Sequence, residues 1–163
     1  MEYKCSDCPR NCSALRGIHT AQGICRSPLH AHVVRAAAHF GEEPCISGER
    51  GSGAVFFSGC NLRCVFCQNR EISRSSAGRE LDYRQLRELF LHLRDQGVHN
   101  INLVTPSHYA REIIRALDGL ERGIPVVWNS SGYDKVEMLR ELEGLVQDFM
   151  PDLKSLKREP AAK

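Results

Sequence analysis

Three closely spaced cysteines constrain this sequence more than any other feature. Cys60, Cys64 and Cys67 follow one another with the spacing C-x3-C-x2-C. They come directly after a short apolar run, residues 54–57, which predicts a buried strand. Thiolates this close together on a loop are typical ligands of a soft metal or an iron–sulfur cluster. Because this loop supplies three ligands rather than four, one iron of a four-iron cluster would stay open to another ligand.

The composition predicts a folded domain and excludes several classes of partner. The 163 residues are 42% hydrophobic and 26% charged, which is ordinary for a globular protein. No apolar run approaches the roughly 20 residues that a transmembrane helix needs, and no signal peptide is visible. A net charge of +2 is too small to indicate nucleic acid or an anionic membrane as a partner. We therefore expect a cytoplasmic location, no nucleic acid and no membrane.

A second group of cysteines lies near the start of the chain. Cys5, Cys8, Cys12 and Cys25 have the spacing C-x2-C-x3-C-x12-C, among glycines and prolines that predict loops. Eight cysteines without an export signal favour reduced thiols and metal binding over a disulfide framework. We expect these four to bind zinc or an iron–sulfur cluster in a saturated, structural site. Buried free thiols are the alternative.

We divide the chain into a Cys-rich segment, residues 1–48, and a second region, residues 49–163. Within the first, His30 and His32 are spaced like a metal pair, but no cysteine or carboxylate is spaced to complete a site. Surface or packing roles are therefore favoured for both. Cys45 stands alone, and we expect it to be a small core side chain rather than a ligand.

Three helices are predicted after the cysteine loop. Asp82 is placed to cap a helix that runs to about residue 96, and Ser107 is placed to cap the next. A third helix is expected to start at Asp134, with Val136 among the residues that face inward.

Four strands alternate with these helices, and polar residues follow each strand. The strands are predicted at residues 54–57, 100–104, 124–128 and 145–150. Alternation with short loops indicates a parallel sheet with right-handed crossovers. In such sheets the chemistry lies at the carboxyl ends of the strands. Those ends carry residues 58–60, 105–108 and 129–132, then Asp152 and Lys154. We expect them to line one pocket.

The cysteine spacing, together with the aromatic Phe66 before the third cysteine, resembles the signature of the radical S-adenosylmethionine (SAM) enzymes. The resemblance implies that Cys60, Cys64 and Cys67 hold a [4Fe-4S] cluster, whose open iron is chelated by the amine and carboxylate of SAM. It further implies reductive cleavage of SAM to a 5′-deoxyadenosyl radical that abstracts hydrogen from a substrate.

Longer stretches resemble a narrower group, the radical proteins related to pyruvate formate-lyase activating enzyme. They are CSDCPRNC with a later G-x-C, GEEPCISGERGSGAVFFSGCNLRCVFCQNREIS, HNINLVTPSHY, NSSGYDKVEMLRELEG and MPDLK. This resemblance implies an α/β fold, a partial parallel (β/α) barrel of the radical SAM type with an irregular Cys-rich N-terminal segment. The implied partners are an electron donor such as flavodoxin or ferredoxin and a protein substrate whose glycine loses hydrogen.

The same resemblance implies a set of cofactor-binding residues. Residues 105–108 would lie near the methionyl amine, and residues 129–131 near the ribose or carboxylate. Asp152 and Lys154 would lie on the rim at the fourth strand. The set is Phe66, Thr105, Ser107, Asn129, Ser130, Asp152 and Lys154. Ordinary turn and cap roles are the alternative for the polar members.

Relatives in that group continue past the fourth strand, whereas this sequence ends at Lys163. Four strands cannot close a barrel, so we expect the fourth to present an unpaired edge. The alternatives are a truncated form, a fragment, or a subunit completed by another chain. A non-catalytic iron–sulfur or zinc-binding interaction module is therefore the alternative to an enzyme. A zinc-ribbon nucleic-acid binder is disfavoured because the basic residues are dispersed.

Overall fold

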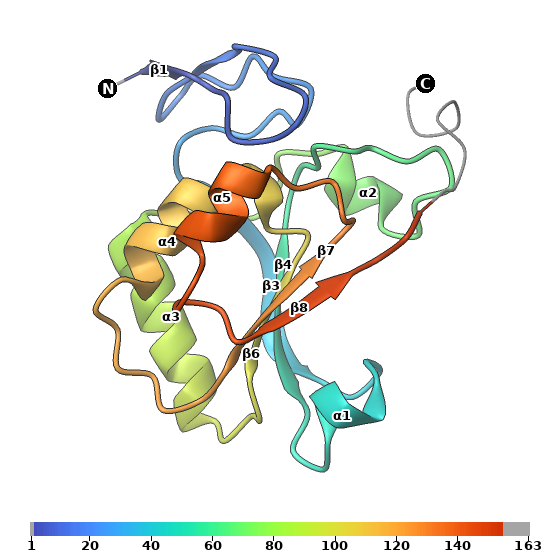
Figure 1. The fold of residues 1–163 in the computed structure, drawn as a ribbon, viewed down its shortest axis with the longest axis vertical. Helices are drawn as coiled ribbons and strands as arrows, with labels where there is room; N and C mark the ends of the chain where they lie inside the picture. Colours follow the sequence, from blue (N-terminus) through green and yellow to red (C-terminus); the bar gives the residue numbers. More distant parts are fainter. Residues whose placement is uncertain (1, 155–163) are drawn as a thin grey trace.

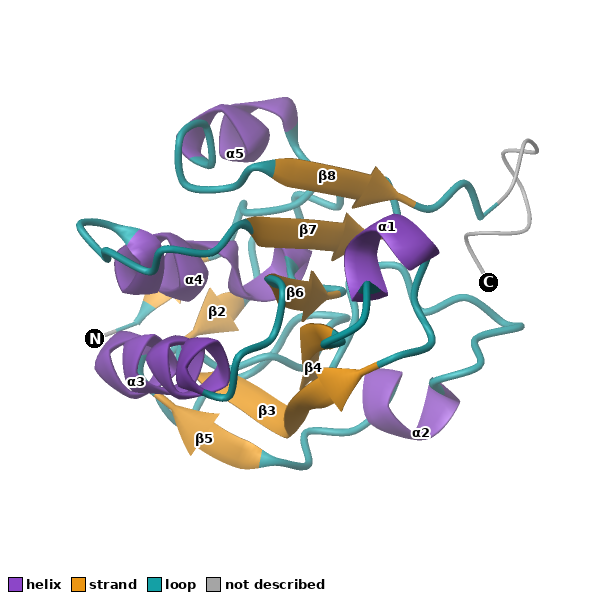
Figure 2. Ribbon diagram, turned by 90° about the horizontal axis from the view of Figure 1, so that it is seen from below, coloured by secondary structure: helices purple, strands orange, loops and turns teal. Residues whose placement is uncertain are grey.

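A six-stranded sheet with the order β5-β3-β4-β6-β7-β8 forms the centre of the computed structural model, which describes residues 2–154. Four neighbours, β4, β6, β7 and β8, run parallel, and β3 is antiparallel to both β4 and β5. Figure 2 shows the six strands side by side. The strands are β3 (Ala31–His39), β4 (Ser52–Phe57), β5 (Arg79–Leu81), β6 (Ile101–Val104), β7 (Val126–Ser130) and β8 (Asp148–Pro151).

Three longer helices cover one side of this sheet, and α1 lies on the other side (Figure 1). A 3-10 turn, Ser107–Tyr109, leads directly into α4. The helices are α1 (Pro44–Ser47), α2 (Arg70–Ser73), α3 (Tyr83–Asp95), α4 (Ala110–Leu117) and α5 (Val136–Glu141). None of the helices among residues 2–154 is long and apolar enough to cross a bilayer.

The hydrophobic core lies between the sheet and α3, α4 and α5. Inward side chains of the parallel strands, such as Leu103 and Trp128, belong to the same core cluster as Phe90 of α3, and all three are at most 1% exposed. The predicted cap of α3 is confirmed: the Asp82 carboxylate accepts hydrogen bonds from the backbone N–H groups of Arg84 and Gln85, both at 2.9 Å. Burial along this face fixes the parallel strands in register beneath the helices.

The sheet differs from the expectation in two ways. Strands β3 and β5 were not predicted, and β3 lies within the segment assigned to residues 1–48 although it pairs with β4. The sheet is open and mostly parallel, and the described residues form no closed barrel. Strand β8 lies at its edge and pairs with β7.

Three local predictions were wrong. Ser107 does not cap a helix through its side chain; it lies in the 3-10 turn and its hydroxyl donates to Asp134. Helix α5 begins at Val136 rather than at Asp134, and the Val136 side chain is 58% exposed rather than inward-facing. The buried side of α5 instead carries Met138, which is 5% exposed. Cys45 is exposed and does not belong to the core.

Residues 2–28, here called the N-terminal lobe, stand apart from the sheet and are drawn in blue at the top of Figure 1. The lobe contains a two-stranded antiparallel pair, β1 (Tyr3–Lys4) and β2 (Leu15–Arg16). Polar contacts attach it to the rest of the molecule: Arg111 of α4 donates to the Asp7 carboxylate at 2.6 Å, and the Lys135 ammonium lies 3.0 Å from the Ser6 carbonyl. The lobe is therefore docked beside α4 and the start of α5.

Candidate functional site

The loop after β4 brings its three cysteines to one cavity of about 370 Å³. Cys60 and Cys64 are buried and Cys67 is half-buried. The backbone N–H groups of Leu62 and Arg63 both donate to Cys60 Sγ at 3.4 Å. N–H donors aimed at sulfur stabilise the thiolate form, which is the form that ligates metal.

Neighbouring groups complete the surroundings of these thiols. The Ser73 hydroxyl lies 3.5 Å from Cys67 Sγ. Burial, and after it the proximity of Cys60, holds the pKa of Cys64 above its ordinary value, although the Lys154 cation acts in the opposite direction. The cation of Lys154 is therefore close enough to favour an anionic sulfur at this loop.

The loop can approach the N-terminal lobe only because a glycine precedes its first cysteine. Gly59 has φ of +79°, and a Cβ at this position would lie 2.5 Å from the Cys25 carbonyl oxygen and 2.7 Å from Ser27 Oγ. A larger side chain would clash with the lobe as well as strain the backbone. The cysteine loop and the N-terminal lobe are therefore in direct contact.

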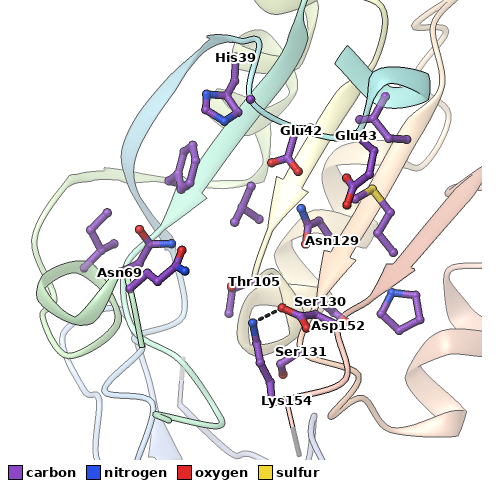
Figure 3. A pocket seen from close by; sticks show the side chains of 18 of the residues that line it. His39, Glu42, Glu43, Asn69, Thr105, Asn129, Ser130, Ser131, Asp152 and Lys154 are labelled. Carbon is purple, nitrogen blue, oxygen red and sulfur yellow. Dashed lines mark hydrogen bonds and ion pairs between the residues drawn. The ribbon is translucent and has the colours of Figure 1, made fainter. Parts of the chain in front are cut away.

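A larger cavity of about 960 Å³ continues from the cysteine loop across the carboxyl ends of β6, β7 and β8. The two cavities share lining residues, among them Thr105, Ser131, Asp152 and Lys154. Figure 3 shows the larger cavity with the ion pair of Lys154 and Asp152 at its rim. The strand ends converge on one open space beside the three thiols, as the alternation of strands and helices predicts.

The structure brings most of the predicted cofactor-binding residues to these cavities. Phe66, 55% exposed, lines the cysteine side, and Asn129 and Ser130 line the larger cavity. Ser107 lines neither cavity; it is 3% exposed and faces Asp134.

Thr105 stands out at the end of β6 because its backbone is left-handed, with φ of +54°. A β-branched residue in this region is strained, and such strain persists where the surrounding structure enforces it, often at functional sites. Its N–H donates to the Asn129 carbonyl at 2.8 Å, which ties the ends of β6 and β7 together. The geometry thus holds the Thr105 side chain at the junction of the two cavities.

Two adjacent serines after β7 differ in what their hydroxyls contact. The Ser130 hydroxyl donates to Asp134, which also accepts from Ser107 and from the Trp128 indole N–H at 3.4 Å. The Ser131 hydroxyl is buried without a partner and lines both cavities. A buried hydroxyl without a partner marks a position where a ligand atom would be favourably bound. Ser131 is therefore better placed than Ser130 to contact a ligand.

Sequence reasoning missed the opposite wall of the larger cavity. Arg35 and His39 project from β3, and Glu42 and Glu43 come from the loop that follows it. Figure 3 shows both glutamates across the cavity from Asp152 and Lys154. The alternation of Arg35, residue 37 and His39 was the available signal, because it places both polar side chains on one face of a strand.

The arrangement of the thiols is the test of whether this loop fits a cluster. Among residues 2–154, no three or more His, Cys, Asp or Glu side chains are placed as the ligands of a single metal ion. Cys60, Cys64 and Cys67 nonetheless line one cavity, where Cys60 Sγ accepts from backbone N–H groups and Cys67 Sγ from the Ser73 hydroxyl. Three thiols that line one cavity can each bind a different iron of a multi-iron cluster.

Comparisons with known proteins identify the family of this chain. An uncharacterized protein of Methanocaldococcus jannaschii is 32% identical over 159 residues, which is 92% of this chain and 45% of the relative. The chain thus spans about half the length of that protein. No solved structure gives a significant match. The family model of the radical SAM superfamily, whose members typically bind a [4Fe-4S] cluster and SAM, matches residues 54–160. The chain belongs to the radical SAM superfamily.

Proposed function

We propose that this chain carries the cluster and SAM site of an enzyme that cleaves SAM reductively to start hydrogen abstraction. The observation that carries the proposal is the continuity of two cavities. The three thiols line one of them, and the polar ends of β6, β7 and β8 line both. A cofactor that binds in the larger cavity would therefore reach the cysteine loop without crossing protein.

Cys60, Cys64 and Cys67 are the proposed ligands of the [4Fe-4S] cluster. The N–H groups of Leu62 and Arg63 hold Cys60 Sγ in place and offset part of its negative charge. Once reduced by an electron donor, a bound cluster would supply the electron that cleaves the sulfonium of SAM to methionine and a 5′-deoxyadenosyl radical, which would take hydrogen from the substrate.

The residues between the two cavities are the proposed SAM contacts. Thr105 and Ser131 line both cavities and present a hydroxyl each, and Asn129 adds an amide from the end of β7. Lys154 and Asp152 offer one cation and one anion at the rim, suited to the carboxylate and amine of the methionyl group. Phe66 supplies an exposed aromatic side chain beside the cysteines.

The narrower role is that of an activating enzyme, which takes hydrogen from a glycine of a partner protein. Support comes from the stretches that resemble proteins related to pyruvate formate-lyase activating enzyme, and from the size of the open cavity, about 960 Å³. An exposed cavity of this size would admit a polypeptide loop as well as the cofactor. A flavodoxin or ferredoxin is the proposed electron donor.

Anaerobic reconstitution with iron and sulfide tests the proposal. We expect a broad absorbance near about 400 nm and, after reduction with dithionite, formation of 5′-deoxyadenosine from SAM. Cys64→Ala should abolish both signals, whereas Cys45→Ser, which changes an exposed cysteine outside the cluster loop, should retain the absorbance. A loaded cluster that yields no 5′-deoxyadenosine would overturn the enzymatic proposal and favour the non-catalytic iron–sulfur module.

The two serines after β7 test the cofactor assignment with matched variants. Ser131→Ala removes a hydroxyl without a protein partner at the cavities, so we expect about tenfold weaker SAM binding. Ser130→Ala removes a hydroxyl that faces Asp134, so we expect lower stability with SAM affinity of the remaining folded protein little changed. Equal loss of affinity in both variants, measured by isothermal titration of the cluster-loaded protein, would contradict the assignment.

A further inference from the structure

The N-terminal lobe lacks an apolar core of its own. None of its alanine, leucine, isoleucine or tyrosine side chains is buried, and Ile18 and Ile24 are 37% and 43% exposed. Its two strands have two residues each. A segment this small gains too little from burial to order itself, so it needs another source of stability.

The lobe brings four thiols to one cavity. Cys5, Cys8, Cys12 and Cys25 all line it, although twelve residues separate the last two. A Cβ on Gly23 would lie 3.6 Å from Sγ of both Cys12 and Cys25, which places both sulfurs beside the same glycine. All four are free thiols. The fold therefore gathers the complete set that the spacing predicts.

A buried cation stands beside these thiols. Arg16 is 2% exposed, and its Nη1 donates to Cys5 Sγ at 3.6 Å and to Asp7 Oδ2 at 3.5 Å. Its Nε is buried without a partner, and the side chain lines the same cavity as the four cysteines. A guanidinium in this position favours thiolates and offsets the charge of a site with four of them.

The backbone next to the cysteines is strained. Five non-glycine residues among those described have positive φ, and four of them are sequence neighbours of a cysteine. Three lie in the lobe: Asn11 and Ser13 on either side of Cys12, and Arg26 after Cys25. Strained positions persist only where another interaction holds them. Bonds from the adjacent thiolates to a metal would provide that interaction.

We propose that Cys5, Cys8, Cys12 and Cys25 bind one zinc ion as a four-thiolate structural site. Zinc is favoured because four thiolates saturate its tetrahedral shell and leave no open position, which suits a lobe without a core rather than a reacting centre. The thiols do not already stand as ligands of one ion, so they close around zinc as it binds. Binding then contributes directly to the folding of the lobe.

The same site braces the cluster loop. Arg10, between Cys8 and Cys12, donates to the backbone carbonyls of Asn61 and Leu62, the latter at 3.1 Å. In return, Arg63 of the cluster loop donates to the Ile24 carbonyl at 3.1 Å, next to Cys25. Each cysteine loop thus holds the backbone of the other. This bracing role rests on the proposed function of Cys60, Cys64 and Cys67, whereas the zinc site does not.

Metal analysis of the whole chain tests the zinc site. We expect about one zinc per chain, and an X-ray absorption spectrum at the zinc edge that fits four sulfurs at about 2.3 Å. Protein in which Cys60, Cys64 and Cys67 are all replaced by alanine should lose its iron and keep its zinc. Iron retained by that variant at about four per chain would overturn the zinc assignment in favour of a second cluster.

Matched cysteine variants locate the zinc. Cys8→Ser should lower the zinc content to about a tenth or less, whereas Cys45→Ser should leave it unchanged. If Cys8→Ser does not fold, release of zinc from the wild-type chain by an organomercurial, followed with a chromogenic chelator, gives the same information. Zinc that stays bound when the lobe thiols are modified, or wild-type protein without zinc, would contradict the proposal.

Arg10→Ala tests the brace without touching a ligand. We expect normal zinc content but at least about fivefold faster loss of the cluster absorbance in air, because two hydrogen bonds from a charged donor are removed. Lys4→Ala is the control, since it removes an exposed cation from β1. Unchanged cluster lifetime in Arg10→Ala would reject the brace and leave the zinc site standing. Absence of a cluster in the wild type with zinc present would instead reject the proposed function.

Discussion

The N-terminal lobe and the sheet, with the helices that cover it, are stabilised by different interactions. The sheet and helices bury continuous apolar faces, and side chains such as Phe90 and Trp128 are at most 1% exposed. The lobe instead buries an ion-pair network in which Asp7 meets Arg16 and Arg111. Apolar burial is insensitive to the details of neighbouring charges, whereas a buried charge depends on each partner. The difference predicts where each region is vulnerable.

The largest loss of stability is expected from a substitution in the core between the sheet and the helices. Phe90→Ala removes a fully buried aromatic side chain of α3 and should lower the free energy of unfolding by about 4 kcal/mol. Phe149→Ala is the matched control on the edge strand β8, where the side chain is 46% exposed. Urea denaturation followed by circular dichroism measures both. Similar losses in the two variants would show that β8 is covered in solution.

A smaller and more local effect is expected in the lobe. Asp7→Asn leaves the guanidinium of Arg16, 2% exposed, without its carboxylate, and removing one partner of a buried pair costs about 3 kcal/mol. Hydrogen exchange should rise in residues 2–28 while α3 remains protected.

Asp95→Asn is the control for the lobe variant, because Asp95 forms an exposed pair with Arg94 that contributes less than about 1 kcal/mol. Loss of protection in both the lobe and α3 of Asp7→Asn would show that the two regions unfold together, and the contrast between them would be lost.

The same contrast explains how much could be predicted from the sequence. The four parallel strands and α3 were predicted because their apolar patterns and the Asp82 cap are local signals. Strand β3 was missed: its run of alanines resembles a helix former, and its pairing with β4 and β5 is long-range and antiparallel. The sequence also could not show that the carboxylate of Asp134 turns toward Ser107 and Ser130, since that contact joins two strand ends.

Within the site, local sequence motifs predicted the three cysteines but not the residues on the opposite wall of the larger cavity. The spacing of Cys60, Cys64 and Cys67 is a property of one loop, so the sequence carries it completely. Glu42 and Glu43 reach the larger cavity only because β3 pairs with β4. Residues that enter a site through an unpredicted strand pairing leave no signal of their own in a single sequence.

The cap of α3 gives a smaller effect with a defined pH dependence. Asp82→Ala should cost about 1 kcal/mol. Backbone hydrogen bonds, first from Gln85 and also from Arg84, lower the pKa of Asp82 more than its slight burial raises it. The stabilisation is therefore complete above the unfolded pKa of about 3.9 and is lost as the pH falls through the lower folded value.

Asp82→Asn separates the charge of the cap from its hydrogen bonds. The asparagine side chain still accepts hydrogen bonds from the backbone N–H groups, so most of the stability should remain. The loss of stability at acidic pH that comes from protonation of Asp82 should disappear. Thermal unfolding of the three proteins between neutral and acidic pH measures the difference. An acid dependence that persists unchanged in Asp82→Asn would assign it to another carboxylate.

The smallest expected effect compares strain in the two regions. Thr105 carries left-handed strain of about 1–2 kcal/mol. Thr105→Gly relieves it at a cost of about 0.5–1 kcal/mol in backbone entropy, so stability should rise by about 0.5 kcal/mol. SAM binding should weaken in the same variant, because the hydroxyl at the junction of the two cavities is lost. In the lobe, Ser13→Gly should likewise relieve strain, but with no effect on SAM binding. The strained backbone at Thr105 therefore lowers stability at a position that contacts the ligand, whereas the strained backbone beside Cys12 lies outside the SAM site. Equal SAM affinity in Thr105→Gly and Ser13→Gly would contradict this difference between the two regions.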